Sequence, residues 1–163
     1  MYVIYVGDSK DVLKRIKTDH CRGNVEASAL RRHIAEALGY RLRHQKRPSG
    51  STRTRIDLPD PKQGEKRVSN YIQTGRWRVI LCPTYETAKD FQWYAIEKLN
   101  PLLNRDRKTY QENRTAMYQQ LLQELIESPL LGCTSIDPET RSGPGVYALY
   151  HQSMPRQYTI DRL

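Results

Sequence analysis

Hydrophobic residues along this chain recur with two different periods, and each period predicts a different kind of element. Short runs rich in β-branched and aromatic residues predict strands, because such side chains pack well on a pleated surface. The predicted strands are residues 2–7, 76–82 and 146–151. Apolar residues three or four positions apart predict helices instead. The predicted helices are residues 10–18, 26–39, 65–73, 85–99 and 108–127. Strands alternating with helices predict an α/β (α+β) fold, with a small three-stranded sheet flanked by helices.

One long stretch, residues 41–64, breaks this pattern. It contains Pro48, Gly50 and Pro59 and has no sustained apolar period, which predicts a loop or flexible arm. The whole chain has 163 residues, enough for one core and too few for two full-sized ones. We therefore expect a single domain over residues 1–163, with residues 41–64 as an inserted arm.

Composition narrows the class of protein. With 37% hydrophobic and 28% charged residues, the chain is expected to be soluble and folded. No apolar run reaches the roughly 20 residues that a membrane span needs, and the first residues do not resemble a signal peptide. The chain has three cysteines, which lie far apart in the sequence: Cys21, Cys82 and Cys133. An odd number at such spacings argues against a disulfide framework and against a cysteine zinc site. These features favour the cytoplasm.

Positive charge is concentrated near the start of the chain. The 27 basic and 18 acidic residues give a net charge of +9, of which +8 lies in residues 1–56. Residues 41–55 hold six basic residues and no acidic one. Such a patch attracts polyanions, because each neutralised phosphate releases counterions. It lacks the apolar helical face of a membrane-surface segment, but a merely solvated basic loop remains an alternative. The candidate DNA contacts in this arm are Arg41, Arg43, Lys46, Arg47, Arg53 and Arg55.

The first strand and the segment after it resemble the second half of the GIY-YIG nuclease signature. In that family a strand ends in Tyr-Ile-Gly, and an Arg lies eight residues after the Gly. Here Tyr5-Val6-Gly7 is followed at that spacing by Arg15. A glycine permits close approach of a phosphate to the backbone, and an arginine offers a fixed fork of donors to phosphate oxygens. The resemblance implies a small α/β nuclease domain that acts on DNA.

The first half of the signature, Gly-Ile-Tyr, should lie shortly before Tyr5, where only four residues are present. Gly145-Val146-Tyr147 instead opens a strand near the other end of the chain. We interpret this as a circularly permuted GIY-YIG domain, with the permuted strand at residues 144–151. Permutation is tolerated where the two termini lie close together at an exposed loop. A strand supplied by a second chain is the rival explanation.

The helix at residues 85–99 resembles the last helix of the family, with one departure. Ile96, Leu99, Pro101 and Asn104 match its pattern, and these and the earlier segments leave residues 41–64 and 108–127 as additions. The metal-binding Glu of the family lies four residues before Ile96, where this chain has Gln92. A carboxylate binds Mg²⁺ or Mn²⁺, one per site, whereas a neutral amide does so much less well. Neither Glu86 nor Glu97 is placed on the helix to substitute.

The resemblance supplies the remaining candidate site residues. Tyr5 and Tyr147 should face one cleft, where one of them orients or deprotonates water, and His20 could reach it from the helix end. Asn104 would steady the site, or simply end the helix. Further candidate phosphate contacts are Gly7, Lys14, Lys17, Arg31 and Arg32. Each basic side chain among them could equally belong to a solvated face.

Together these features predict a metal-dependent, restriction-type DNA endonuclease that hydrolyses phosphodiester bonds in double-stranded DNA. A one-metal site makes one cut, so double-strand breaks would require a homo-oligomer. Gln92 marks this chain as either an inactivated form of a working enzyme or a nuclease-dead relative. Two alternatives stay open: a non-catalytic DNA-binding module with a decayed site, and an RNA-binding or assembly protein that uses the basic arm alone.

Overall fold

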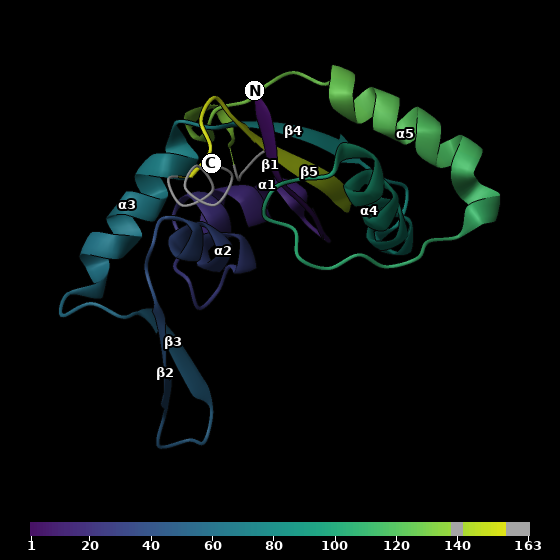
Figure 1. Cartoon of the computed structure of the whole chain (residues 1–163). Helices are drawn as coiled ribbons and strands as arrows, with labels where there is room; N and C mark the ends of the chain where they lie inside the picture. Colours follow the sequence, from purple (N-terminus) through teal and green to yellow (C-terminus); the bar gives the residue numbers. More distant parts are fainter. Residues whose placement is uncertain (138–141, 156–163) are drawn as a thin grey trace, which may run out of the picture.

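The computed structural model describes residues 1–137 and 142–155, and Figure 1 shows their arrangement. The strands are β1 (Tyr2–Ser9), β2 (Leu42–Lys46), β3 (Thr52–Ile56), β4 (Arg76–Leu81) and β5 (Gly145–His151). The helices are α1 (Val12–Lys14), α2 (Ala29–Ala37), α3 (Pro61–Gln73), α4 (Tyr85–Leu99) and α5 (Thr115–Glu127). A π-helix η1 (Arg15–Cys21) and two 3₁₀ turns, η2 (Glu112–Arg114) and η3 (Cys133–Ser135), complete the elements. The predicted mixed α/β class is confirmed.

The last strand of the sequence lies in the middle of the main sheet. The sheet is antiparallel with the order β1-β5-β4, so β5 has a strand on each side. Gly7 of β1 lies opposite Tyr147, and Ser9 lies opposite Gly145. Most of β5 is buried, which explains why Val146, Tyr147, Ala148 and Leu149 form an unbroken apolar run.

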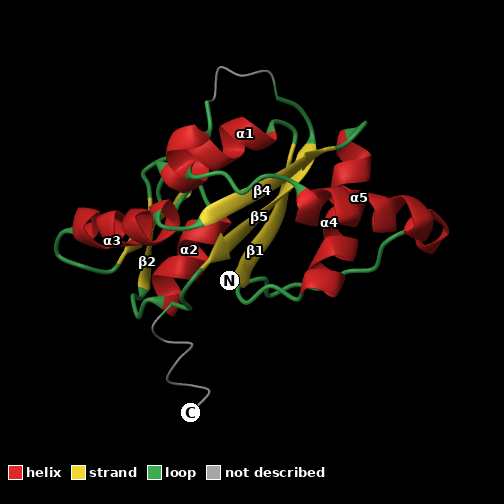
Figure 2. Ribbon diagram, turned by 90° about the horizontal axis from the view of Figure 1, so that it is seen from above, coloured by secondary structure: helices red, strands yellow, loops and turns green. Residues whose placement is uncertain are grey.

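Helices cover both faces of this sheet (Figure 2). Ile4, Trp77, Tyr147 and Leu149 belong to the core that the sheet shares with η1, α2 and α3. Val6, Ile80, Val146 and Ala148 belong to the core on the other face, which α4 and α5 complete. The site residues described below lie on the first face and at the β1 edge.

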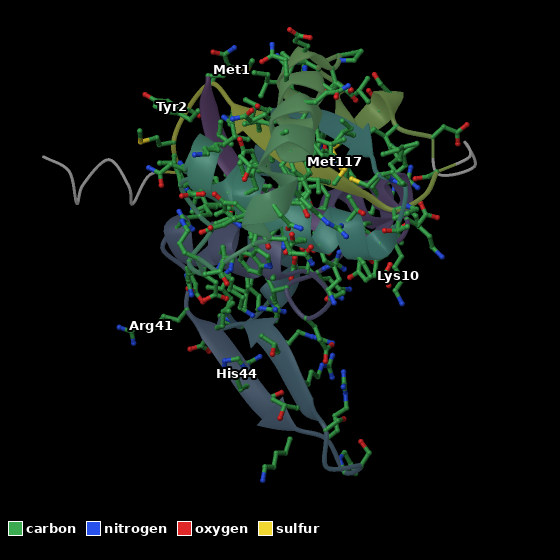
Figure 3. All side chains as sticks on the ribbon, turned by 90° about the vertical axis from the view of Figure 1, so that its right-hand side faces the viewer. Met1, Tyr2, Lys10, Arg41, His44 and Met117 are labelled. Atoms are coloured by element: carbon green, nitrogen blue, oxygen red, sulfur yellow. A yellow bond between two sulfur atoms is a disulfide. The ribbon has the colours of Figure 1, made fainter. Side chains whose placement is uncertain are left out.

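The basic segment is not a loop, contrary to the sequence prediction. β2 and β3 pair antiparallel as a separate hairpin that projects from the body (Figures 1 and 3). Its turn contains Gly50, whose φ of +90° suits a residue without a side chain. The sequence did not reveal these strands, because most of their residues are exposed to solvent and both faces of the hairpin carry polar side chains. A strand is recognised in a sequence when apolar and polar residues alternate, and here that contrast is absent.

Helix boundaries also differ from the prediction in informative ways. α3 begins at Pro61 rather than residue 65, because the Asp60 side chain accepts a hydrogen bond from the Lys62 amide and Pro61 occupies the first turn. The helix expected at residues 10–18 is a short α1 followed by η1. The helix expected to begin at residue 108 begins only with η2 and α5.

Two of the three cysteines are paired, so the expectation drawn from their spacing is wrong for them. A disulfide joins Cys21 at the end of η1 to Cys133 in η3, 112 residues later, and Cys82 is a buried free thiol. Sequence separation does not limit such a pair, because the fold brings their Cα atoms to 6.3 Å. Among the described residues, no helix is long and apolar enough to cross a membrane.

Candidate active site

The two signature tyrosines lie side by side on one face of the sheet. The rings of Tyr5 and Tyr147 stack with centroids 6.4 Å apart. A Cβ on Gly7 would lie 2.3 Å from the Tyr147 hydroxyl, so the absence of a side chain at Gly7 makes room for that phenol. This differs from the sequence interpretation, in which Gly7 makes room for a phosphate. Burial raises the pKa of Tyr5, against the influence of Arg15, and raises that of Tyr147 well above 10.0.

His20 lies in the protein interior and not at the mouth of a cleft. Its Nε2 is 2.6 Å from the Tyr147 hydroxyl and its Nδ1 is 2.7 Å from the Ser28 hydroxyl. The side chain is 1% exposed, and burial lowers its pKa well below 6.5. Both ring nitrogens are therefore engaged, and the neutral imidazole holds Tyr147 in position. The i→i+5 bonding of η1 lets residue 20, and not residue 19, face the sheet.

These groups belong to a larger cluster of hydrogen-bonded polar side chains. Arg31 donates to the His20 carbonyl at 2.9 Å and pairs with Glu65 at 2.7 Å. It also donates to the Ser69 hydroxyl at 2.9 Å, although its own side chain is fully buried. We call Tyr147, His20, Ser28, Arg31, Glu65 and Ser69 the buried polar network.

Arg15 lies beside the tyrosines and is partly exposed. Its guanidinium pairs with Asp19 at 2.8 Å and donates to the Ala27 carbonyl at 3.1 Å. Arg15 also influences the pKa values of both Tyr5 and Tyr147, which places its charge close to their hydroxyls. Asp19 thus fixes the guanidinium while leaving part of it available to a phosphate.

Gln92 lies in a pocket at the β1 edge of the sheet. The pocket has a volume of about 190 Å³ and is lined by Tyr5, His33, Gln92, Trp93, Ile96, Asn104, Arg105 and Asp106. Asn104 is fixed in the wall of this pocket, because its amide forms two hydrogen bonds of 2.9 Å with the Val6 backbone. Asn104 does not end α4, since Asn100 caps that helix with a φ of 48°. The fold therefore brings Tyr5, Gln92 and Asn104 together.

The basic candidates divide into buried and exposed groups. Lys17 is buried and donates to the Cys133 carbonyl, and Arg31 belongs to the buried polar network. Neither has the access that a phosphate contact needs, which corrects the sequence interpretation. Arg32 is partly exposed and donates to the Val25 and Glu26 carbonyls, while Lys14 is exposed. The hairpin residues remain accessible, with Arg41, Lys46, Arg47 and Arg53 exposed and Arg43 and Arg55 partly so.

Sequence reasoning missed His33, which lines the pocket with Gln92. Its ring centroid is 6.2 Å from that of Tyr5, and its buried Nδ1 has no hydrogen-bond partner among the residues that the structure describes. The signal in the sequence was a histidine at helical spacing between Leu30 and Ala37, two buried residues of α2. A polar side chain on an otherwise apolar face of a helix needs a hydrogen-bond partner.

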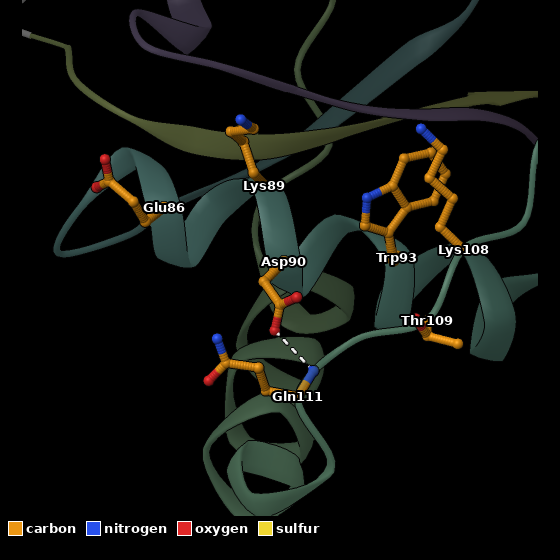
Figure 4. A pocket seen from close by; sticks show the side chains of 7 residues that line it. All are labelled: Glu86, Lys89, Asp90, Trp93, Lys108, Thr109 and Gln111. Atoms are coloured by element: carbon orange, nitrogen blue, oxygen red, sulfur yellow. Dashed lines mark hydrogen bonds between the residues drawn. The ribbon is translucent and has the colours of Figure 1, made fainter.

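A second, larger pocket lies on the outer side of α4 (Figure 4). It has a volume of about 540 Å³, and Trp93 lines both pockets. Glu86 lies in this outer pocket, apart from Tyr5 and Gln92, and Glu97 accepts a hydrogen bond from Tyr110. The structure thus gives neither glutamate a place beside Gln92.

Comparison with known proteins supports the same class of domain. The framework described above is a three-stranded antiparallel sheet that carries Tyr5 and Tyr147, with Arg15 beside them at the start of η1. The family model described as the GIY-YIG catalytic domain matches residues 1–128. The chain belongs to the GIY-YIG family and carries a nuclease-type domain. No curated protein and no solved structure matches it.

The residues around Gln92 do not form an adequate divalent-metal site as they stand. Gln92 offers a neutral amide, and the Asn104 amide is occupied by the Val6 backbone. Asp106 is the single acidic residue lining this pocket. In residues 1–137 and 142–155 no group of three or more His, Cys, Asp or Glu side chains could hold a metal ion. The neutral amide at position 92 is the physical reason, because Mg²⁺ requires a compensating charge.

Proposed function

We propose that this protein is a restriction-type DNA endonuclease whose site is disarmed at Gln92. The observation that carries the proposal is the shared pocket of Tyr5, Gln92 and Asn104, with Arg15 close to the tyrosines. The family resemblance expects a Glu at this position of α4. A Gln keeps the shape of that side chain but removes its charge, so substrate binding is retained while hydrolysis is lost.

The chain's own residues have separable roles in this proposal. Arg15 binds the scissile phosphate and stabilises the charge that grows on it. Tyr5, with its raised pKa, is a neutral phenol that orients the attacking water instead of removing its proton. Tyr147 and His20 are positioning residues, since both are buried. The Gln92→Glu variant is expected to hold one Mg²⁺ or Mn²⁺, which when bound supplies positive charge beside the phosphate.

We also propose that the domain spans residues 1–163 as a circularly permuted GIY-YIG unit. Two observations support this: β5 carries Gly145-Val146-Tyr147 between β1 and β4, and its Tyr147 lies opposite Gly7 of the other half-signature. In this proposal the same chain supplies the strand, which the pairing of β5 with both β1 and β4 supports. The family match ends at residue 128, before this strand begins. Residues 156–163, which belong to the loop that would lead from β5 back to β1, lie outside the described residues.

The proposed substrate is duplex DNA, and the proposed compartment is the cytoplasm. The protein is proposed to act as a homo-oligomer. The net charge of +9 and the accessible basic hairpin support the nucleic-acid partner. In a reducing compartment Cys21 and Cys133 would be two adjacent thiols, which mass measurement of protein alkylated inside cells would detect. Sedimentation of the protein alone and with DNA tests the oligomer.

The decisive experiment is cleavage of unmodified long duplex DNA with Mg²⁺ or Mn²⁺. Long DNA of high complexity contains any short recognition sequence, so a required site is not missed. We expect the parent chain to be inert and Gln92→Glu to cut. Adding Arg15→Ala to the cutting variant should lower its rate by about 10²–10³-fold, the cost of losing one charge-stabilising group.

Gln119→Glu provides the matched control, because it adds the same charge on an exposed face of α5. It should stay inert. If Gln92→Glu is also inert while both proteins bind duplex DNA, the nuclease proposal fails and the DNA-binding module replaces it.

A further inference from the structure

The hairpin has two chemically different faces. Residues directly opposite each other on antiparallel strands share a face, and faces alternate along each strand. The register pairs Arg43 with Arg55 and Gln45 with Arg53, so these side chains share one face, which we call the arginine face. The opposite face carries His44 with Thr54 and Lys46 with Thr52, which we call the lysine face. The 3.1 Å contact between His44 and Thr54 is consistent with this assignment.

The arginine face already holds an anion. The Glu26 carboxylate, from the segment before α2, accepts from Arg47 at 2.6 Å and from Arg55 at 2.9 Å. Arg43 and Arg55 are like charges facing each other, an arrangement that is unfavourable without a counterion. Glu26 supplies it for Arg55, and Asp57 lies 3.6 Å from Arg43. One carboxylate between two guanidinium groups imitates the way in which a phosphate would be held.

Beyond Glu26 the same face is open. Gln45 and Arg53 are both exposed, and the side chain of neither has a hydrogen bond or ion pair within the part of the chain that the structure describes. Long polar side chains held on a paired ribbon, with free donors and acceptors, are suited to contact another molecule.

This face is also connected to the candidate active site. Arg15 donates to the Ala27 carbonyl, and Arg32 donates to the Val25 and Glu26 carbonyls. The site arginine therefore contacts Ala27, and the hairpin arginines contact its neighbour Glu26. A nucleic acid whose backbone reaches Arg15 lies close to this segment and to the base of the hairpin.

We propose that the hairpin enters the major groove of duplex DNA, with Gln45 and Arg53 reading base edges and the Arg47–Glu26–Arg55 cluster set against the backbone. The proposal deepens the proposed function and rests on it for duplex DNA as the substrate. The major groove admits a two-stranded ribbon, and each strand here is about 16 Å long at the usual rise per residue. Arg pairs bidentately with guanine and Gln with adenine. A-form RNA has a major groove too narrow for such a ribbon.

The test uses the parent chain, because Gln92 is expected to permit binding without cutting. Duplexes retained from a randomised DNA pool are sequenced for the parent, Gln45→Ala and Arg53→Ala. Lys46→Ala is the matched control, since it removes one charge from the same hairpin but from the lysine face. We expect the parent to enrich one sequence. Each arginine-face variant should lose preference at its own position by about 10- to 100-fold.

Lys46→Ala should keep the enriched sequence and weaken binding to all duplexes alike. The proposal is overturned if no sequence is enriched, if variants on the two faces behave alike, or if double-helical RNA competes as well as DNA. Its failure is distinguishable from that of the nuclease proposal. If a sequence is enriched but the Gln92→Glu variant does not cut, only the nuclease proposal is rejected. If that variant cuts but no sequence is enriched, only the proposal that the hairpin reads bases is rejected.

Discussion

Two arginine-bearing regions of this protein look alike in sequence and differ in almost every physical respect. Arg31 of α2 is fully buried, pairs with Glu65 and belongs to the network that ends at Tyr147. Arg53 of β3 is exposed on a projecting hairpin and has no partner among the described residues. The first arginine contributes to the stability of the fold, whereas the second is available to a ligand.

The difference teaches that the environment of a charge decides its role. A buried charge must be paired and fully hydrogen-bonded, and removing one partner is then costly. An exposed charge contributes little to stability but keeps its full capacity to bind an anion. The four predictions below test this contrast, from the largest expected effect to the smallest.

The largest effect is expected from Arg31→Met. This substitution removes the Arg31 donor from the His20 carbonyl and leaves the Glu65 carboxylate with only the Val25 amide as a donor, so the free energy of unfolding should fall by about 3–5 kcal/mol. Urea unfolding followed by circular dichroism measures the change. An unaltered unfolding midpoint would show that the network does not support the fold.

Gly7→Ala should act on the same network from the opposite strand. Its new Cβ would lie 2.3 Å from the Tyr147 hydroxyl, and such overpacking costs about 1–3 kcal/mol. Gly143→Ala is the control, because no atom of the described residues lies within 4 Å of the Cβ it would add. Thermal or urea unfolding of both variants should separate them, and equal stabilities would contradict the close packing of Tyr147 on β1.

Acidic pH should weaken the buried network and not the hairpin. Burial lowers the folded-state pKa of His20 well below 6.5, so the unfolded chain binds the proton first as the pH falls. Stability is therefore retained above about pH 6.5 and lost below it, by at most about 1.4 kcal/mol per pH unit for this one group. His33 and His151 have lowered pKa values as well and act in the same direction.

The measurement is the pH dependence of urea unfolding between about pH 7 and 5 for the parent and for His20→Gln. The variant should have a smaller slope, even if its stability at pH 7 is lower. Identical slopes would mean that His20 does not titrate differently in the two states.

The smallest effect on stability is expected from Arg53→Ala, at less than about 0.5 kcal/mol. Its effect should instead appear in DNA binding, where losing the base-reading Arg53 side chain should cost about 1–3 kcal/mol on the enriched duplex and little on unrelated duplexes. Titration of an enriched and an unrelated duplex measures this. A stability loss as large as that of Arg31→Met would abolish the contrast between the two regions.

Local pattern was sufficient for the elements whose faces are clearly apolar. Residues 76–82, 85–99 and 146–151 are predicted nearly to the residue, because buried strands and amphipathic helices carry a strong period. The hairpin was missed because both of its faces are polar, so apolar and polar residues do not alternate along its strands. The departure at Gln92 is an expectation from the family resemblance, which places a Glu four residues before Ile96.

The sequence by itself therefore determined the family signature, its main elements and the position, Gln92, at which the resemblance leads us to expect a carboxylate. Only the tertiary structure decided that β5 lies between β1 and β4, that Cys21 meets Cys133, and that Arg31 is buried while Arg53 is free. It also decided that His20 holds Tyr147 from the interior, across 127 positions of sequence. The physical reason is that periodicity fixes local conformation, whereas partners and burial depend on which distant segments pack together.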